Sequence, residues 1–220
     1  MICLCGCAGT GTGTGGTGAN PANNVRPNVT GDMFNYSVTG TYRATPTSLS
    51  VATTGTATEA FQANTYNGQA ALESTVTTIL ALASGSQTFI ESEQLSGTGV
   101  TLGVTDAGTL QAVTTGGFTK PSTLTTTTSI SGTETLANGK MVALLYTVTG
   151  AVNITTKAGT FACWTVTRSI TYSDGFSSND TIEFAPSIGA AVQEVVHNSY
   201  SNGFSDILTA SLTSYSFGGT

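Results

Sequence analysis

The sequence predicts an all-β domain: an antiparallel, strongly curved sheet of about ten to twelve strands, shaped as a half-barrel or flattened barrel, with at most one short covering helix. Three observations support this class. β-branched and aromatic residues gather in short segments, turn signals such as Asn67-Gly68 and Asn138-Gly139 separate these segments, and threonine is the most frequent residue. The branched Cβ of threonine restricts χ1 and favours strands over helices.

The first strands show the clearest alternation of apolar and polar residues. It runs through residues 34–42 and predicts a strand with one buried face. Residues 48–57 and 59–66 continue the pattern as far as Asn67-Gly68. Both residues of that dipeptide tolerate positive φ, so it predicts a type I′ hairpin.

Residues 69–82 fit two patterns. Their apolar residues recur at helical spacing and fit strand alternation equally well. The β-branched run at residues 75–79 lowers helix propensity, and the preceding hairpin signal requires a partner strand. A strand is favoured, and a helix covering the concave face of the sheet is the alternative.

The middle and end of the chain contain further strand candidates separated by turns such as Asp106-Ala107-Gly108. One of them, at residues 124–130, is rich in threonine and poor in apolar residues, which predicts a position at the edge of the sheet. The other candidates are residues 87–95, 100–104, 109–113, 141–149 and 206–217.

Residues 158–196 organise the predicted domain. Strands are expected at residues 161–172, 181–184 and 190–196, with a turn signal at residues 173–175 after the first. Side chains alternate along a strand, so one face of the first strand carries an apolar set interrupted by Arg168. The members of that set predicted to face a ligand are Trp164, Val166 and Ile170.

The amino-terminal residues resemble a bacterial lipobox. In Leu4-Cys5-Gly6-Cys7 a small residue precedes a cysteine, so Cys7 would be the lipidated residue. Residues 1–7 would then be the remnant of a signal whose start lies upstream of Met1, since a signal peptide has a longer apolar stretch. Residues 8–31 would be a flexible Gly/Thr/Asn-rich tether, and residues 32–220 a single β domain.

The last part of the chain resembles a family of uncharacterised bacterial envelope proteins. The resemblance covers about the last 65 residues and rests on a Gly-Thr-Phe strand opening, an aromatic-Ala-Pro-x-Ile-Gly turn and a closing Leu-x-Ser-Tyr strand. It implies a curved antiparallel sheet similar to that of periplasmic lipoprotein carriers. Independently, the proline fixes φ and the glycine gives backbone freedom, so the motif predicts a structural turn. Its residues are Phe184, Ala185, Pro186, Ile188 and Gly189.

Composition argues against nucleic acid as a partner. The net charge is -6, and only six lysines and arginines are present; binding to phosphate backbones needs basic side chains. No apolar run is long enough for a membrane-spanning helix.

Catalytic signatures are also missing. The lone histidine, His197, could combine with Ser199 and Asp206, but no nucleophile-elbow or oxyanion motif accompanies them. Cys163 has no basic sequence neighbour and is expected to be a buried apolar residue. We therefore expect a protein that is not an enzyme and has no cofactor.

Acidic residues offer only weak metal candidates. Glu91 and Glu93 face the same way on one strand and could form a carboxylate pair, and Asp174 and Asp180 border loops. None has the spacing of a calcium loop, and acidic residues in turns usually cap backbone amides. No metal site is predicted.

These observations favour a non-enzymatic, lipid-anchored protein of the bacterial cell envelope, at the outer membrane or cell surface. It would bind an apolar ligand or a protein partner on its curved sheet. The alternative is a structural or adhesive β-sandwich subunit of a surface assembly, whose threonine-rich edges pair between copies.

Overall fold

The computed structural model describes residues 20–43, 45, 47–82 and 85–219, and the described residues form twelve strands and no helix. In chain order the strands are β1 (Met33–Arg43), β2 (Val51–Tyr66), β3 (Gln69–Leu82), β4 (Gly85–Ser96), β5 (Thr101–Asp106), β6 (Thr109–Thr115), β7 (Ser129–Leu136), β8 (Met141–Thr156), β9 (Gly159–Tyr172), β10 (Ser177–Ala185), β11 (Ala190–Ser199) and β12 (Ser205–Ser216).

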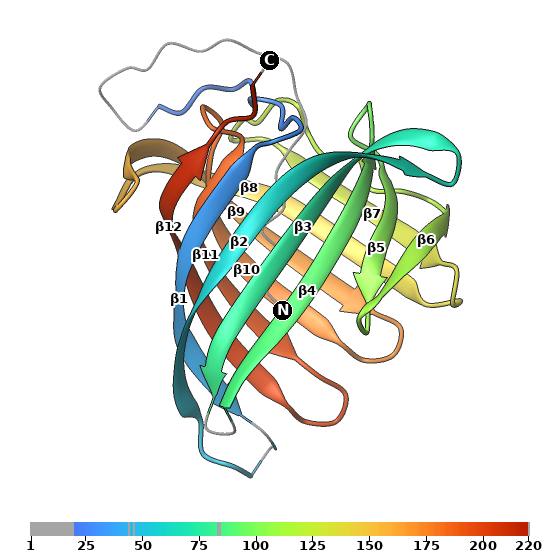
Figure 1. Cartoon of the computed structure of the whole chain (residues 1–220), viewed down its shortest axis with the longest axis vertical. Helices are drawn as coiled ribbons and strands as arrows, with labels where there is room; N and C mark the ends of the chain where they lie inside the picture. The colour runs from blue at the N-terminus through green and yellow to red at the C-terminus, as the bar shows by residue number, and fades with distance from the viewer. Residues whose placement is uncertain (1–19, 44, 46, 83–84, 220) are drawn as a thin grey trace.

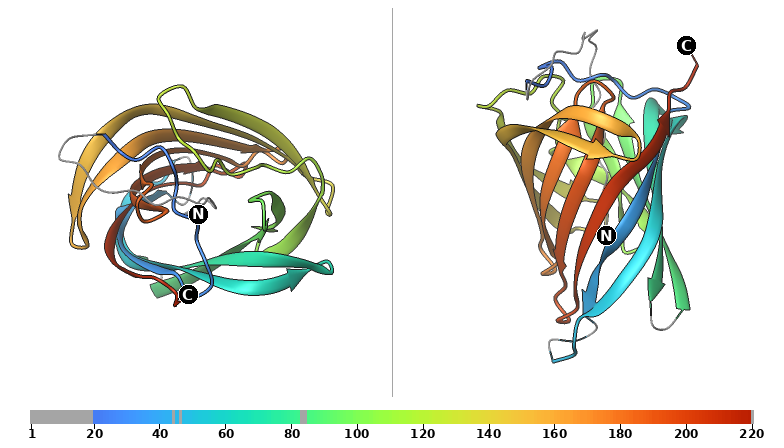
Figure 2. Two further views of the ribbon diagram at one scale, coloured as in Figure 1. Left: turned by 90° about the horizontal axis from the view of Figure 1, so that it is seen from above. Right: turned by 90° about the vertical axis from the view of Figure 1, so that its left-hand side faces the viewer.

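The strands form one closed barrel (Figure 1). Each strand pairs antiparallel with its neighbours in sequence, and β1 pairs with β12 from Met33 opposite Ser216 to Arg43 opposite Ser205. Viewed from above, the barrel is flattened rather than round (Figure 2). The all-β prediction is confirmed, and residues 69–82 are a strand. Among the described residues no helix is long and apolar enough to span a membrane.

Alternation along the strands separates a mainly apolar interior from a polar outer face. In β1, Phe34, Tyr36 and Val38 are buried, whereas the residues between them are less so. Cross-strand neighbours on the outer face are often threonines and serines, such as Thr58 opposite Thr77. The abundance of threonine therefore reflects a pleated outer surface that is polar but mostly uncharged.

The hairpin turns follow the local signals. Asn67 and Gly68 have φ values of 49° and 78°, the positive pair that a type I′ turn requires. Ala107 and Gly108 form an equivalent turn, with φ values of 48° and 79°.

The prediction of an edge strand over residues 124–130 is wrong. β7 begins only at Ser129, and the preceding residues belong to a long loop. Leu124 is fully buried in that loop, and its N–H donates to the carbonyl of Asn23. Tertiary contact with the amino-terminal segment therefore holds these residues outside the sheet.

One end of the barrel is crossed by residues 20–32, which we call the strap (Figure 2). Val25 is fully buried and its N–H donates to the carbonyl of Ser122. The N–H of Arg26 donates to the carbonyl of Pro186, and the indole Nε1 of Trp164 donates to the carbonyl of Ala22. Of the tether expected over residues 8–31, residues 8–19 lie outside the described residues, and residues 20–31 pack on the barrel.

The predicted structural turn lies beneath the strap and joins β10 to β11. Phe184, Ala185 and Ile188 are buried. Gly189 has a φ of 70°, and a Cβ there would lie 2.4 Å from the carbonyl oxygen of Arg26. Only glycine fits, because the backbone is left-handed and the strap passes directly over it.

Candidate ligand-binding cavity

The barrel interior contains two adjoining cavities. The deep cavity has a volume of about 110 Å³, and the mouth cavity, toward the end opposite the strap, has about 260 Å³. Consecutive inward positions of β3 line them in turn: Ser74 and Val76 face the deep cavity, and Thr78, Leu80 and Leu82 the mouth cavity. The two cavities therefore follow each other along the barrel axis.

Apolar side chains from both sides of the barrel line much of the deep cavity. They come from β3, β5, β8, β9 and β10 and are Val76, Val104, Val142, Leu144, Ile170, Ile182 and Phe184. Of the three residues predicted to face a ligand, Ile170 lines this cavity. Trp164 and Val166 are buried in the core, with Trp164 packed beneath the strap.

Aromatic side chains surround the other end. The rings of Tyr42 and Phe204 lie 6.3 Å apart between centroids, and Tyr42, Phe89 and Phe204 line the mouth cavity. Phe176 packs between Tyr172 and Tyr200, at centroid distances of 5.4 and 5.1 Å. Phe89 remains 41% exposed although it lines the cavity, so the mouth is only partly covered.

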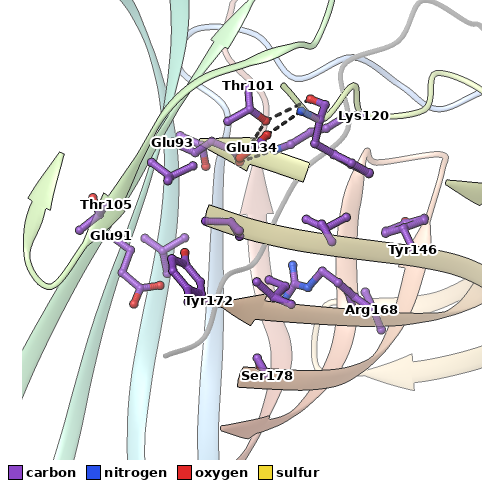
Figure 3. Close-up of a pocket in the computed structure, with 18 of the residues that line it drawn as sticks. Glu91, Glu93, Thr101, Thr105, Lys120, Glu134, Tyr146, Arg168, Tyr172 and Ser178 are labelled. Atoms are coloured by element: carbon purple, nitrogen blue, oxygen red, sulfur yellow. Dashed lines mark hydrogen bonds and ion pairs between the residues drawn. The ribbon is translucent and has the colours of Figure 1, made fainter. Parts of the chain in front are cut away.

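A lysine network forms one wall of the deep cavity (Figure 3). The Nζ of Lys120 lies 2.5 Å from Oε2 of Glu93, and Thr101 donates to the other oxygen of Glu93 at 3.0 Å. Glu134 accepts the backbone N–H of Phe118 at 2.6 Å. Burial raises the pKa of Glu134, and the nearby charge of Glu93 raises it further.

An arginine network forms a second polar group across the barrel. Arg168 of β9 donates from Nε to Asp180 at 2.7 Å and from its guanidinium to Glu194 at 2.7 Å. Ser178 donates to the second oxygen of Asp180. The side chain of Arg168 is 5% exposed, and those of Asp180 and Glu194 are fully buried. This arginine is therefore engaged by two carboxylates.

Glu91 is placed differently from these paired residues. Its side chain points into the deep cavity from β4, between Thr105 and Tyr172 in Figure 3. No hydrogen bond or ion pair joins it to another described residue. Burial raises its pKa to about 7; the charge of Asp206 also acts to raise it, and that of Arg168 to lower it.

Two further carboxylates in the interior are held by neutral donors. Asp206 accepts hydrogen bonds from Asn198 at 2.8 Å and from the phenol of Tyr200 at 3.1 Å. Burial raises the pKa of Tyr200, and the neighbouring Asp206 contributes in the same direction. Glu59 accepts the hydroxyl of Ser74 at 3.0 Å.

Acidic side chains therefore outnumber basic ones on the inner wall of the described barrel. The cations are Lys120 and Arg168, and each lies beside carboxylates. The carboxylates are Glu59, Glu91, Glu93, Glu134, Asp180, Glu194 and Asp206. The inner wall is thus anionic, whereas the outer face is mostly neutral.

The structure does not assemble the catalytic group considered from sequence. His197 is exposed on the outer face of β11, whereas Asp206 is buried and faces the interior. Cys163 is a buried free thiol, as expected, and burial raises its pKa to about 12. A thiol with so high a pKa is a poor nucleophile at neutral pH.

The metal candidates have other roles. Asp174 pairs with Lys140 at 2.6 Å on the surface, and Asp180 pairs with Arg168. Glu91 and Glu93 share the inner face, as the alternation predicted. Among the described residues, no group of three or more potential metal ligands comes together.

Comparisons with known proteins find structures of similar shape but no matching family. No family model matches the chain, and no curated protein matches it. One solved structure that aligns with it is a protein described as exported, with a YmcC-like fold, from Bacteroides fragilis. The TM-score is 0.40 at 12% identity, over 89% of this chain and 99% of that one.

A second aligned structure is a protein described as a lipoprotein from Parabacteroides distasonis. The TM-score is 0.44 at 12% identity, over 90% of this chain and 100% of that one. Neither alignment tests the Gly-Thr-Phe and Ala-Pro-x-Ile-Gly motifs, so the family resemblance stays a prediction.

Proposed function

We propose that this protein is a non-enzymatic binding protein that holds an apolar or amphipathic small molecule inside its barrel. The observation that carries the proposal is the pair of adjoining cavities, apolar along most of their walls, reached from the end opposite the strap. Ligand pockets are typically lined by apolar side chains with a few polar groups, and have volumes of roughly 300–1,000 Å³. The mouth cavity alone, at about 260 Å³, approaches that range.

The polar groups of the cavity favour binding over catalysis. The described residues that line it include neither histidine nor cysteine, and its lysine and arginine are held by carboxylates. Nucleophilic catalysis would need an activated nucleophile beside a base. Charged groups that are already paired instead suit a fixed wall around a ligand.

The adhesive alternative is not supported by the fold. Pairing between copies would need a sandwich with free threonine-rich edges, but β1 and β12 pair along their whole length and close the sheet. Within the described barrel, unpaired stretches remain where the pairing is short: β4 pairs with β5 from Glu93 to Leu95 alone, and β6 pairs with β7 near Val113 and Thr115.

The envelope location is part of the proposal and rests on the lipobox resemblance at Cys7. The acyl chains on Cys7 would anchor the protein in the membrane, most simply the outer membrane, since Ala8 rather than aspartate follows the cysteine. Mass analysis of the mature amino terminus tests this, and an unmodified Cys7 in the native protein would contradict it.

Titration with N-phenyl-1-naphthylamine, a neutral probe whose fluorescence increases in apolar surroundings, tests the binding function. Two neighbouring leucines of β8 provide matched variants. Leu144 lines the deep cavity, whereas Leu145 is 46% exposed on the outer face. We expect saturable binding at one site, at least about tenfold weaker in Leu144→Trp because the indole fills the cavity, and unchanged in Leu145→Trp.

The thermal melting of both variants is the control for folding. If the probe does not bind saturably to the wild-type protein, or if the two variants bind it equally well, the cavity is not the binding site.

A further inference from the structure

The charge of the inner wall restricts which ligands fit. An anionic head group needs an available cation, but Lys120 lies 2.5 Å from Glu93, and Arg168 contacts both Asp180 and Glu194. Displacing one of these carboxylates would leave it buried without its counter-ion, which is costly. The cavity therefore disfavours fatty acids and phosphate-bearing lipids.

Glu91 is the group that can engage a ligand. It is partly buried, and it lines the deep cavity from β4. No described residue donates to it or pairs with it. Since no described side chain of the wall donates to it, this carboxylate can form a strong hydrogen bond with a charged or polar donor on a ligand in the cavity.

The position of Glu91 also sets the orientation of that ligand. The next inward residue toward the mouth on β4 is Phe89, and Leu80 and Leu82 of β3 line the same cavity. A head group at Glu91 can therefore be continuous with an apolar body that extends to the mouth. In the opposite orientation the charged head group would lie at the mouth, away from Glu91 and beside Phe89, Leu80 and Leu82.

We propose that the ligand is an amphipathic amine, whose protonated nitrogen binds Glu91 and whose apolar body occupies the mouth cavity. This inference rests on the proposed binding function and specifies its ligand class. An ammonium donates charge-assisted hydrogen bonds to a carboxylate, and these are roughly twice as strong as neutral ones. The surplus of carboxylates on the wall attracts the same charge.

Three ligands that share one alkyl chain test the head group: decylamine, decanol and decanoate. Each is used below its micelle-forming concentration to displace N-phenyl-1-naphthylamine at about pH 8, where Glu91 is ionised and the amine is protonated. We expect decylamine to bind at least about tenfold more tightly than decanol, and decanoate to bind most weakly. In Glu91→Gln the advantage of decylamine over decanol should fall to about threefold or less.

The matched control is Glu73→Gln, which removes one negative charge from the outer face, where Glu73 accepts a hydrogen bond from Gln62. It should keep the amine preference of the wild-type protein. Equal displacement by the three ligands would overturn the amine inference and leave the binding function in place. A wild-type protein that does not bind the probe itself would overturn the binding function.

A pH titration of the wild-type protein makes the test independent of any variant. Lowering the pH from about 8 to about 5.5 protonates Glu91, while the amine stays protonated throughout, so decylamine binding should weaken and decanol binding should stay constant. A decylamine affinity that does not change over this range would show that Glu91 does not bind the amine.

Discussion

The strapped end of the barrel and the cavity each hold an interior carboxylate, Asp32 and Glu91, but in opposite surroundings. At the strapped end, Asp32 accepts hydrogen bonds from the guanidinium of Arg26 at 2.7 and 3.0 Å and from the N–H groups of Val29 and Gly218. Arg26 also lies 3.7 Å above the ring of Phe217. In the cavity, Glu91 has no such partner among the described residues.

The difference appears in the pKa values. Burial alone would raise the pKa of Asp32, but the hydrogen bonds from Arg26, Val29 and Gly218 outweigh it and lower that pKa. Burial raises the pKa of Glu91 to about 7. Ionised Asp32 therefore contributes stability at the strapped end, whereas ionised Glu91 in the cavity reduces it.

The largest expected effect compares the arginines of the two regions. Arg168→Met leaves Asp180 and Glu194 buried without their cation and should lower the free energy of unfolding by about 3–5 kcal/mol. Arg26→Met should cost only about 1–2 kcal/mol, because the side chain of Arg26 is 21% exposed and water can replace part of the lost interaction. Urea unfolding of the two variants measures both values.

The ranking of these two variants is the informative result. If Arg168→Met unfolds at the same urea concentration as Arg26→Met or the wild-type protein, the arginine network of the cavity wall is not the buried, strongly coupled group described above.

A smaller effect concerns the pH dependence of stability. The pKa of Glu91 rises from 4.5 to about 7 on folding, so the folded state binds its proton more tightly than the unfolded state. Glu91 therefore reduces stability progressively as the pH rises between these two values. Asp32 has a lowered pKa, so its contribution is present above its unfolded value of 3.8 and is lost as the pH falls through the folded value.

Glu91→Gln isolates the first effect. We expect it to be more stable than the wild-type protein at about pH 8 and equally stable at about pH 4.5. Among the described residues, the charges that act on Glu91 in the folded state are those of Arg168 and Asp206, with Tyr200 and Tyr172 nearby and Glu93 on the same strand. Urea midpoints at the two pH values measure the difference, and a stability gain that is the same at both would mean that the ionised form of Glu91 carries no penalty.

Local patterns predicted the strands and turns because alternation and positive-φ dipeptides act within a few residues. The strand over residues 34–42 and the Asn67-Gly68 turn are confirmed for this reason. Closure of the barrel was not predictable in the same way. It depends on pairing between β1 and β12, which lie at opposite ends of the domain sequence.

The cavity was predicted only in part. Alternation placed Glu91 and Glu93 on one face and Ile170 on the apolar face of β9, and all three line the cavity. It could not show that the strap would cover Trp164. Arg168, which interrupts that apolar face, was the one sequence signal for a buried ion network. The carboxylates that pair with Arg168 could not be predicted from sequence, because they depend on the register of β9 with β10 and on the proximity of β11.

Hydrogen exchange measured with and without a saturating apolar probe tests the central claim most directly, because it reports which end of the barrel the ligand stabilises. The cavity account predicts slower exchange in the segments that line the two cavities, in residues 74–82, 87–93, 142–146 and 200–208, with no change in the strap at residues 20–32. Slower exchange confined to the strap, or no change anywhere at saturation, would contradict it.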